Sequence, residues 1–145
     1  MAQIPVGVYA ISRPNEQLIT VLDNELPTMA MALPPTGQPG EQEWVVEEQP
    51  NGNVTLRNLR NMGYLGVDDD PQVNLPVLGL GKQWEWALYQ SAMPFAFHIV
   101  VPGGPIDGTE LALDFSLLRI YPPRLALRPL DVNNPWQAWR FQFHE

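Results

Sequence analysis

The fold is decided by the stretch TELALDFSLLRIY, which runs from Thr109 to Tyr121 and is the longest part of the chain without proline or glycine. Within it Leu111, Leu113 and Phe115 alternate with other residues, and a period of two is typical of a β-strand rather than a helix. The chain has 16 prolines and 11 glycines, spread along its whole length. Long helices therefore have little room, and the sequence predicts an all-β protein.

Short apolar segments recur along the chain in three units. The predicted opening strands are at 9–11, 54–56 and 97–99, the second strands at 18–22, 64–67 and 110–113, and the third strands at 29–33, 77–80 and 125–127. Each unit closes on a tryptophan strand, at 44–46, 84–88 and 139–141. This regular spacing indicates an internal repeat of four strands.

Three four-stranded units predict a β-trefoil of twelve strands, because a propeller typically needs at least four blades. We expect the first and fourth strands of each unit to close a barrel, and the second and third strands to form hairpins that cap one end. The tryptophans are expected to fill the barrel. The chain is predicted to be one domain over residues 1–145, with repeats at approximately 5–48, 52–90 and 95–145.

Charge and composition exclude several classes of partner. The formal net charge is -8, which repels phosphate backbones and anionic membranes, so we expect neither nucleic acid nor a membrane as a partner. Cysteine is absent, so no disulfide framework and no cysteine-based metal site is possible. The sequence shows no signal peptide and no apolar stretch of membrane-spanning length, which predicts a cytoplasmic protein.

Three segments, Gly7 to Ile11, Trp44 to Glu47 and Trp139 to Phe143, resemble the fungal serine protease inhibitors of β-trefoil type from mushrooms. Those proteins open with a Gly-x-Tyr-x-Ile strand, close the first two repeats on tryptophan strands and end on a similar aromatic strand. The resemblance implies a defence protein that inhibits a protease by presenting a rigid surface loop between the second and third strands. It implies a protease as partner and no cofactor.

In this chain the corresponding loop contains Asn24, Glu25, Leu26 and Pro27. It has no arginine or lysine for the acidic pocket of a trypsin-like protease, so we expect a target other than trypsin through this loop. Leu26 suits a chymotrypsin-like or elastase-like pocket, and Pro27 stiffens the loop, which lowers the entropy lost on docking. The alternative interpretation is a solvated turn rich in turn-forming residues.

A second loop, from Arg57 to Gly63, competes for the inhibitory role. Arg60 is a candidate anchor for trypsin. Asn61 resembles the asparagine that the related mushroom cysteine-protease inhibitors, the mycocypins, present to asparaginyl endopeptidases. The alternative is that Asn61 and Gly63 supply the positive φ angles of a tight turn.

Ricin-B-type lectins share the predicted fold, and two of their Gln-x-Trp triplets are present, at Gln42 to Trp44 and Gln137 to Trp139. The middle repeat departs from this pattern. A sugar pocket needs an Asp, an aromatic platform and an amide side chain. The third repeat offers such a set in Asp114, Tyr121 and Asn133 or Asn134, which predicts one carbohydrate site as the alternative function.

No pattern in the sequence indicates an enzyme. The two histidines are His98, on an apolar strand, and His144, next to the last residue, and neither lies near a serine in sequence. The acidic run Asp68 to Asp70 lacks the spacing of an EF-hand loop, so no metal site is predicted. We expect a binding protein without a cofactor.

Overall fold

Residues 4–13 and 17–143 are described by the computed structural model, and almost all of their regular structure is β-strand. The strands are β1 (Gly7–Arg13), β2 (Gln17–Thr20), β3 (Thr28–Met29), β4 (Met31–Leu33), β5 (Trp44–Glu48), β6 (Val54–Asn58), β7 (Tyr64–Gly66), β8 (Leu78–Leu80), β9 (Ala87–Gln90), β10 (Ala96–Val100), β11 (Leu111–Phe115), β12 (Leu125–Pro129) and β13 (Trp139–Phe143). A short 3-10 helix, η1, covers Pro135–Gln137. None of the described segments is a helix with the length and apolar character needed to cross a bilayer.

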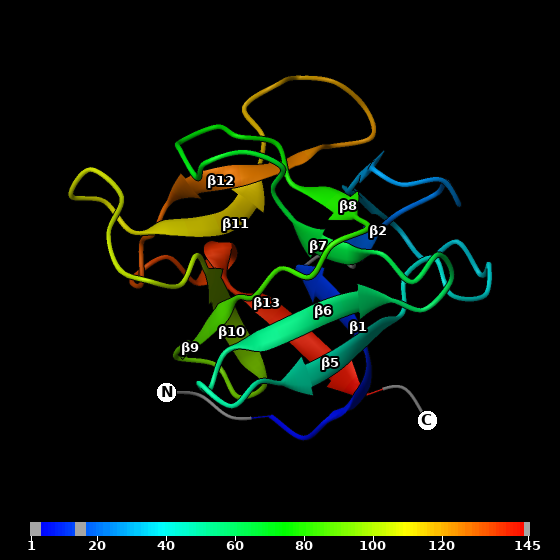
Figure 1. Ribbon diagram of the computed structural model, residues 1–145, viewed down its shortest axis with the longest axis horizontal. Helices are drawn as coiled ribbons and strands as arrows, with labels where there is room; N and C mark the ends of the chain where they lie inside the picture. The colour runs from blue at the N-terminus through cyan, green and yellow to red at the C-terminus, as the bar shows by residue number, and fades with distance from the viewer. Residues whose placement is uncertain (1–3, 14–16, 144–145) are drawn as a thin grey trace.

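The strands form three repeat units, namely β1 to β5, β6 to β9 and β10 to β13 (Figure 1). The all-β, β-trefoil prediction is confirmed, with one difference. The third strand of the first unit is divided at Ala30 into β3 and β4, because β4 pairs with β2 of its own hairpin while β3 pairs with β8 of the next unit.

The outer strands of the three units close a barrel, as expected. β1 pairs with β5 and β13, β5 pairs with β6, and β10 pairs with β9 and β13. The remaining gap between β6 and β9 is closed by a bridge in which Val54 and Trp86 exchange two backbone hydrogen bonds of 2.8 Å each. Closure leaves no free strand edge in the barrel.

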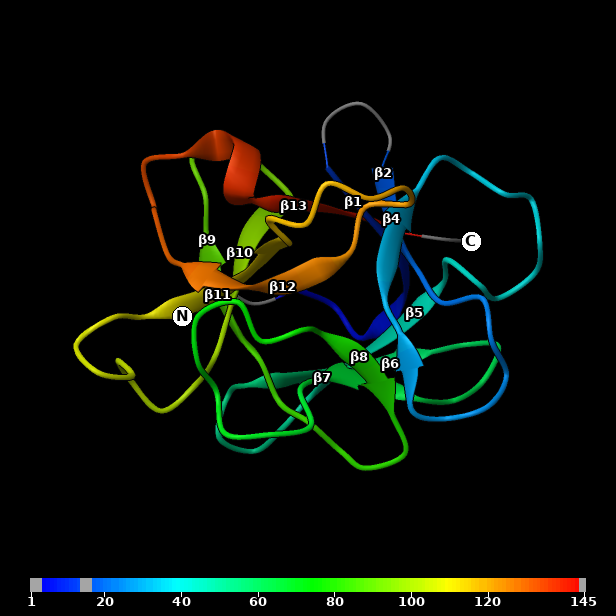
Figure 2. The same ribbon diagram turned by 90° about the horizontal axis from the view of Figure 1, so that it is seen from above.

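Three hairpins cover one end of the barrel: β2 with β4, β7 with β8 and β11 with β12. Seen from above, they lie around a common centre (Figure 2). Backbone N–H groups connect each hairpin to the next, since Ala30 donates to Val77, Val77 donates to Leu125 and Ala32 donates to Pro123. The cap is therefore one hydrogen-bonded layer.

Three tryptophans connect this cap to the barrel. Trp44, Trp86 and Trp139 are fully buried, and each indole N–H donates to a carbonyl of the second strand in its unit. The acceptors are Ile19 O at 3.0 Å, Leu65 O at 2.8 Å and Leu113 O at 3.0 Å. The middle repeat thus uses Trp86 as its core tryptophan, and Trp84 lies where the other two units have the glutamine of the triplet.

We expect Trp86→Phe to lower the free energy of unfolding by at least about 2 kcal/mol, because the Leu65 carbonyl loses its buried donor and a cavity opens beside it. The matched control is Trp136→Phe, which changes an exposed tryptophan and should alter stability by less than about 0.5 kcal/mol. Urea unfolding followed by circular dichroism measures both. Equal stability of the two variants would contradict a structural role for the indole bond.

Candidate functional site

The three indole bonds define equivalent positions in the three repeat units. The residue that follows each acceptor carbonyl is Thr20 in the first unit, Gly66 in the second and Asp114 in the third. The residue two positions before each tryptophan is Gln42, Trp84 and Gln137. In each unit these two residues face one another. A comparison of the three pairs therefore shows how the units differ at this position.

In the third unit the pair is a carboxylate and an amide. Asp114 Oδ2 accepts a hydrogen bond from Gln137 Nε2 at 3.1 Å, and Asp114 Oδ1 accepts the backbone N–H of Phe115 at 2.7 Å. Gln137 also donates to Pro129 O at 2.9 Å and accepts from the N–H of Asp131 at 2.8 Å. Gln137 therefore holds the carboxylate in place, while the Asp114 side chain stays 24% exposed.

The first two units have no carboxylate at this position. Gln42 Nε2 donates to the Thr20 hydroxyl at 3.0 Å, in a buried neutral pair. Gly66 leaves room for Trp84, because a Cβ at Gly66 would lie only 2.6 Å from Cβ and Cγ of Trp84. Only the third unit therefore presents a charged acceptor at this place.

Arg13, at the end of β1, is the charged partner of this carboxylate. Its Nη2 forms an ion pair with Asp114 Oδ1. The guanidinium lies 4.8 Å from the ring centroid of Phe115 and 4.7 Å from that of Trp139. Burial lowers the pKa of Arg13, and the negative charge of Asp114 opposes that effect. The guanidinium remains protonated at neutral pH, so the two residues form a partly buried ion pair against two aromatic rings.

The two candidate asparagines lie in the turn that leads to β13. Asn134 caps η1, and its Oδ1 accepts the backbone N–H of Trp136 at 3.0 Å. The backbone N–H of the exposed Asn133 donates to Asp131 Oδ1 at 3.0 Å. Trp136, directly before Gln137, is 58% exposed. An exposed tryptophan thus lies one residue from the amide that orients Asp114.

Tyr121 lies at the other end of the β11–β12 hairpin. It is 78% exposed in the loop that connects Phe115 to Leu125, which are paired at the closed end of the hairpin. The turn with Asn133 and Asn134 follows the open end, roughly 15 Å away along a five-residue strand. The structure therefore does not bring Tyr121 together with the two asparagines.

Two candidate side chains were not predicted from the sequence: Arg13, which pairs with Asp114, and the exposed Trp136 in the turn before Gln137. Trp136 had a signal, because it directly precedes the Gln-x-Trp triplet in the sequence. Arg13 had none, since 101 residues separate it from Asp114 along the chain. The first repeat unit contributes Arg13 to the third only because the barrel closes between β1 and β13.

The first inhibitory-loop candidates lie between β2 and β3. Asn24, Glu25 and Pro27 are exposed, but Leu26 is only half-buried at the surface and turned toward the second repeat unit. A Cβ at Gly63 would come within 2.6 Å of Leu26 Cδ2. Leu26 therefore packs on the backbone of the neighbouring loop.

Asn61, in that neighbouring loop, connects the two segments. Its Nδ2 donates to Asp23 O at 3.0 Å, and its Oδ1 accepts the N–H of Gly63 at 2.8 Å. The turn interpretation of Asn61 and Gly63 was wrong in its detail, because the positive φ of 63° belongs to Met62. The Asn61 amide thus holds the two loops together through Nδ2 and closes its own turn through Oδ1.

Arg60 is held by an ion pair. Its Nη1 lies 2.5 Å from Oε2 of Glu41, a buried carboxylate, while the Arg60 side chain itself is 36% exposed. The backbone N–H of Arg60 donates to Asn58 Oδ1 at 3.0 Å. These contacts direct the guanidinium toward the first repeat unit.

The acidic run behaves as a solvated loop. Asp68 pairs with Lys82 at 3.5 Å, with both side chains more than half exposed. In the part of the chain that the structure describes, no group of three or more His, Asp or Glu side chains is arranged to hold a metal ion. His144 lies outside the described residues.

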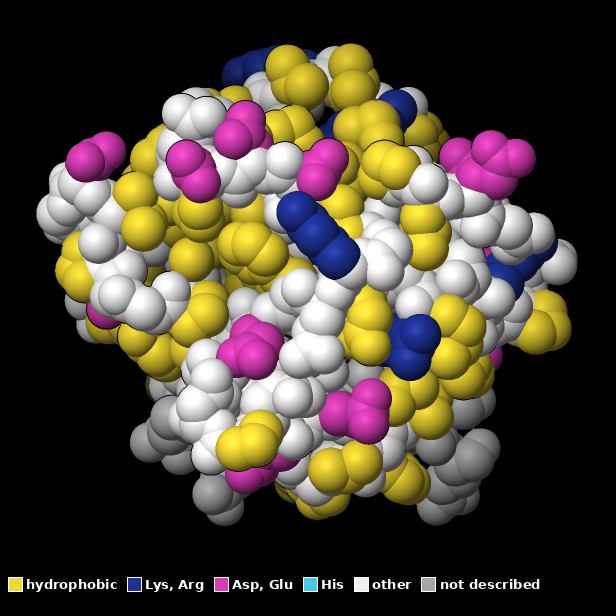
Figure 3. Space-filling model, in the orientation of Figure 1, with side chains coloured by type: hydrophobic (Ala, Val, Ile, Leu, Met, Phe, Trp, Pro, Cys, Tyr) yellow, Lys and Arg dark blue, Asp and Glu magenta, His cyan; other side chains and the backbone are white. Residues whose placement is uncertain are grey.

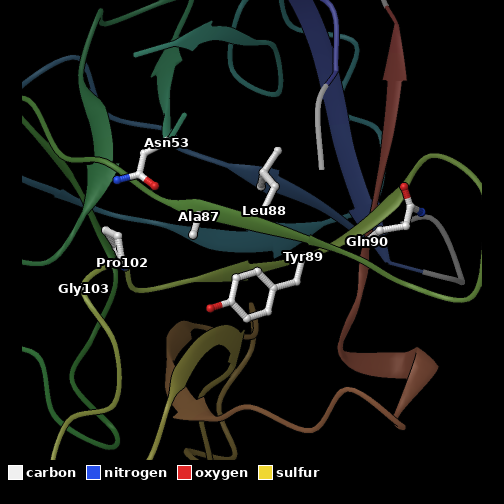
Figure 4. Close-up of a pocket in the computed structure, with 7 residues that line it drawn as sticks. All are labelled: Asn53, Ala87, Leu88, Tyr89, Gln90, Pro102 and Gly103. Carbon is white, nitrogen blue, oxygen red and sulfur yellow. The ribbon is translucent and has the colours of Figure 1, made fainter. Parts of the chain in front are cut away.

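A shallow hollow of about 750 Å³ lies beside β9 (Figure 4). The ring of Tyr89 projects into it, with Asn53 and Pro102 at its rim. The Tyr89 hydroxyl donates to Glu110 at 3.4 Å. Burial raises the pKa of Tyr89, and the charge of Glu110 adds to the effect. Asn53 Nδ2 donates to Glu85 at 3.2 Å, so Asn53 and Tyr89 both already have hydrogen-bond partners within the protein.

His98 lies on β10 of the third unit, where it is paired with Tyr89 of β9. It is 1% exposed, and neither ring nitrogen makes a hydrogen bond of ordinary geometry within the described residues. Burial lowers the pKa of His98, the positive charge of Arg13 lowers it further, and Asp131, the Val132 backbone and Asp114 oppose these effects. At neutral pH the folded protein therefore contains an uncharged, buried histidine whose pKa responds to the charges of Arg13 and Asp114.

This histidine makes stability depend on pH. Its folded pKa is below the unfolded value of 6.5, so below pH 6.5 the unfolded chain binds a proton that the folded chain does not. Above pH 6.5 His98 therefore does not lower the free energy of unfolding. Below pH 6.5 the free energy of unfolding falls as the pH decreases toward the lower pKa of His98 in the folded protein. Urea unfolding from pH 7.5 to 5 is expected to show a steeper loss for the natural protein than for His98→Gln. Parallel curves would contradict this role.

No family model matches the sequence, and no curated protein matches it. Solved structures do resemble the fold. A ricin B-like lectin from Macrolepiota procera, solved in complex with lactose, has 20% identity and a TM-score of 0.79, covering 99% of this chain and all of that one. The Rhizoctonia solani agglutinin has 17% identity, a TM-score of 0.80 and 99% coverage of both chains. The designed threefold-symmetric protein ThreeFoil has 14% identity, a TM-score of 0.78 and covers 95% of this chain and 99% of its own. At these identities the likeness shows that the chain has the β-trefoil fold.

Proposed function

We propose that the protein binds carbohydrate through one site in its third repeat unit, centred on Asp114. The observation that carries this proposal is the Asp114–Gln137 hydrogen bond, which fixes a partly exposed carboxylate at a position where the other units have Thr20 and Gly66. A carboxylate has about four lone-pair sites. Phe115, Gln137 and Arg13 donate to it, and the exposed side can still accept from a ligand hydroxyl.

The surroundings suit a sugar. Neighbouring hydroxyls of a sugar ring are donors for a fixed carboxylate, and the apolar face of the ring packs on an aromatic side chain. Trp136 supplies an exposed indole beside Gln137, and Asn133 is an exposed amide in the same turn. Trp136 thereby takes the platform role for which Tyr121 was the candidate from sequence.

Arg13 sets the strength of this site. Because it already occupies Asp114 Oδ1, a ligand has to share that oxygen with the guanidinium. The ion pair is held against Phe115 and Trp139, so it does not swing away without losing both ring contacts. We therefore expect weak, millimolar-range binding of a single sugar. Of the similar structures, the Macrolepiota lectin was solved with lactose, which supports a carbohydrate and supplies the first probe.

Lactose titration, followed by nuclear magnetic resonance, tests the proposal. Asp114→Asn is expected to weaken lactose binding at least about tenfold, because a neutral amide is a poorer acceptor for hydroxyl donors. Trp136→Ala should weaken it similarly without touching the ion pair. A glycan array extends the search if another sugar is preferred.

The controls are Asp68→Asn, which removes an exposed carboxylate elsewhere, and Tyr121→Ala, which removes another exposed aromatic of the third unit. Both are expected to bind as the natural protein does. Loss of binding in Tyr121→Ala but not in Trp136→Ala would move the platform to the hairpin loop. Absence of binding to every glycan would refute the proposal.

Protease inhibition is the second candidate, and one observation favours it. Asn61 ties the loop after β2 to the loop after β6, so both are preorganised before any partner docks. Asn24 and Glu25 project from this double loop into solvent. As an inhibitor the protein would present this rigid pair of loops to a protease.

A protease panel with trypsin, chymotrypsin, elastase, a papain-like enzyme and an asparaginyl endopeptidase tests this second candidate. Stoichiometric inhibition of one enzyme is expected, and Asn61→Ala should raise the inhibition constant at least about tenfold. Leu26→Ala and Arg60→Ala identify the anchoring side chain. Asn51→Ala, in the exposed turn between β5 and β6, is the matched control. No inhibition of any enzyme would remove this candidate.

A further inference from the structure

The loop between β11 and β12 exposes an unusual group of apolar side chains. Leu117, Leu118, Ile120 and Tyr121 are 66%, 65%, 48% and 78% exposed. The base of the loop is closed by the N–H of Ser116, which donates to Arg124 O at 2.8 Å, and by the N–H of Leu118, which donates to Ser116 Oγ at 3.2 Å. The loop is thus anchored at its base and holds large apolar groups in water, which in a monomeric protein marks an interaction site.

Charge on this hairpin is opposite to that of the rest of the protein. Between Asp114 and Asp131 the chain has no acidic residue and three arginines, Arg119, Arg124 and Arg128, although the whole chain carries a net charge of -8. Among the described residues, none of these arginines forms an ion pair with a carboxylate. Arg124 contacts Met29 Sδ, and Arg128 donates to Asn74.

The loop projects from the end of the molecule that the three hairpins cap (Figure 1). In Figure 3 yellow and dark blue side chains gather at this upper edge, and magenta acidic side chains lie just below it and on both sides. The loop between β7 and β8, in the same cap, carries the exposed Asp68, Asp69 and Asp70. The apolar and basic group is therefore local to the β11–β12 loop.

We propose that this loop, Ser116 to Arg124, is a membrane-docking loop that inserts its four apolar side chains into the headgroup region of a bilayer containing anionic phospholipid. Leucine and isoleucine side chains gain from leaving water, and tyrosine favours the interface between headgroups and acyl chains. Arg119, exposed between Leu118 and Ile120, and Arg124, half-buried at the base of the loop, supply positive charge for lipid phosphates and carboxylates. The expectation from net charge, that anionic membranes are repelled, averages over a charge distribution that is not uniform.

The pattern favours a membrane over other occupants. Nucleic acid would use the arginines but would leave three aliphatic side chains exposed. A protein partner or a second copy of the chain would bury the apolar group, yet a second copy would bring like charges together, with three arginines on each side. An anionic bilayer satisfies both the apolar and the basic groups at once.

Co-sedimentation with lipid vesicles tests the proposal. Vesicles of phosphatidylcholine alone are compared with vesicles that contain about one third phosphatidylserine. Neither preparation contains glycolipid, so failure or success is independent of the proposed sugar site. The partition coefficient is expected to be at least about tenfold higher with phosphatidylserine, and to fall when salt is raised from about 0.1 M to 0.5 M.

Two matched pairs of variants locate the contact. L117S/L118S should lower the partition coefficient at least about tenfold, whereas Phe95→Ser, which removes an equally exposed apolar side chain at the β9–β10 turn on the barrel side of the molecule, should leave it unchanged. Arg119→Gln should reduce binding and its salt dependence, and Arg140→Gln, an exposed arginine on β13, should not. All four variants change exposed side chains, and unchanged melting temperatures verify their folding.

Three results would overturn the proposal. The first is no sedimentation with either vesicle preparation. The second is equal binding by L117S/L118S and the natural protein. The third is a dimer in vesicle-free solution, seen by analytical ultracentrifugation, that L117S/L118S dissociates, because the loop would then be covered by a second copy.

Discussion

Three buried hydrogen bonds, from the indoles of Trp44, Trp86 and Trp139 to carbonyls of the second strands, connect the barrel to its hairpin cap. Each indole fills the barrel interior with its ring and satisfies a carbonyl that water does not reach. Loss of such a donor leaves a buried acceptor unpaired, at a cost of about 1–3 kcal/mol. The position of every hairpin over the barrel depends on this contact. It also defines which residues of the three units correspond.

Beside each of these bonds the three units have different pairs of residues. The first pairs Gln42 with Thr20, the second packs Trp84 against Gly66, and the third joins Gln137 to Asp114. All three pairs are compatible with the fold: a neutral polar pair, an apolar contact and a carboxylate paired with a cation. Only the last leaves an acceptor at the surface. The proposed carbohydrate site therefore arises where the repeat departs from its own symmetry.

Several other charged, titratable and exposed groups also lie in or against the third unit. Arg13 reaches Asp114 from the first unit, the buried His98 lies on β10, and the β11–β12 loop carries the exposed apolar and basic side chains. The proposed sugar site and the proposed docking loop lie at different ends of one hairpin. If both proposals hold, the unit that binds the sugar is also the unit that contacts the lipid.

The sequence by itself determined the fold class. Period-two alternation, the dispersed prolines and glycines, and tryptophans at the end of each unit led to a β-trefoil, because local backbone preference and hydrophobic patterning act within a few residues. Asp114 and Gln137 were also identifiable, the first as a candidate site residue and the second within a recognisable triplet.

What only the tertiary structure decided was which side chains meet. The Arg13–Asp114 pair spans 101 residues, Leu26 turns onto Gly63, and Tyr121 is separated from Asn133 and Asn134 by the length of a hairpin. The core tryptophan of the middle unit is Trp86 because the barrel closes through its bridge to Val54, a pairing between distant strands. Such contacts depend on strand register and barrel closure, and these are set by long-range packing that no local sequence pattern records.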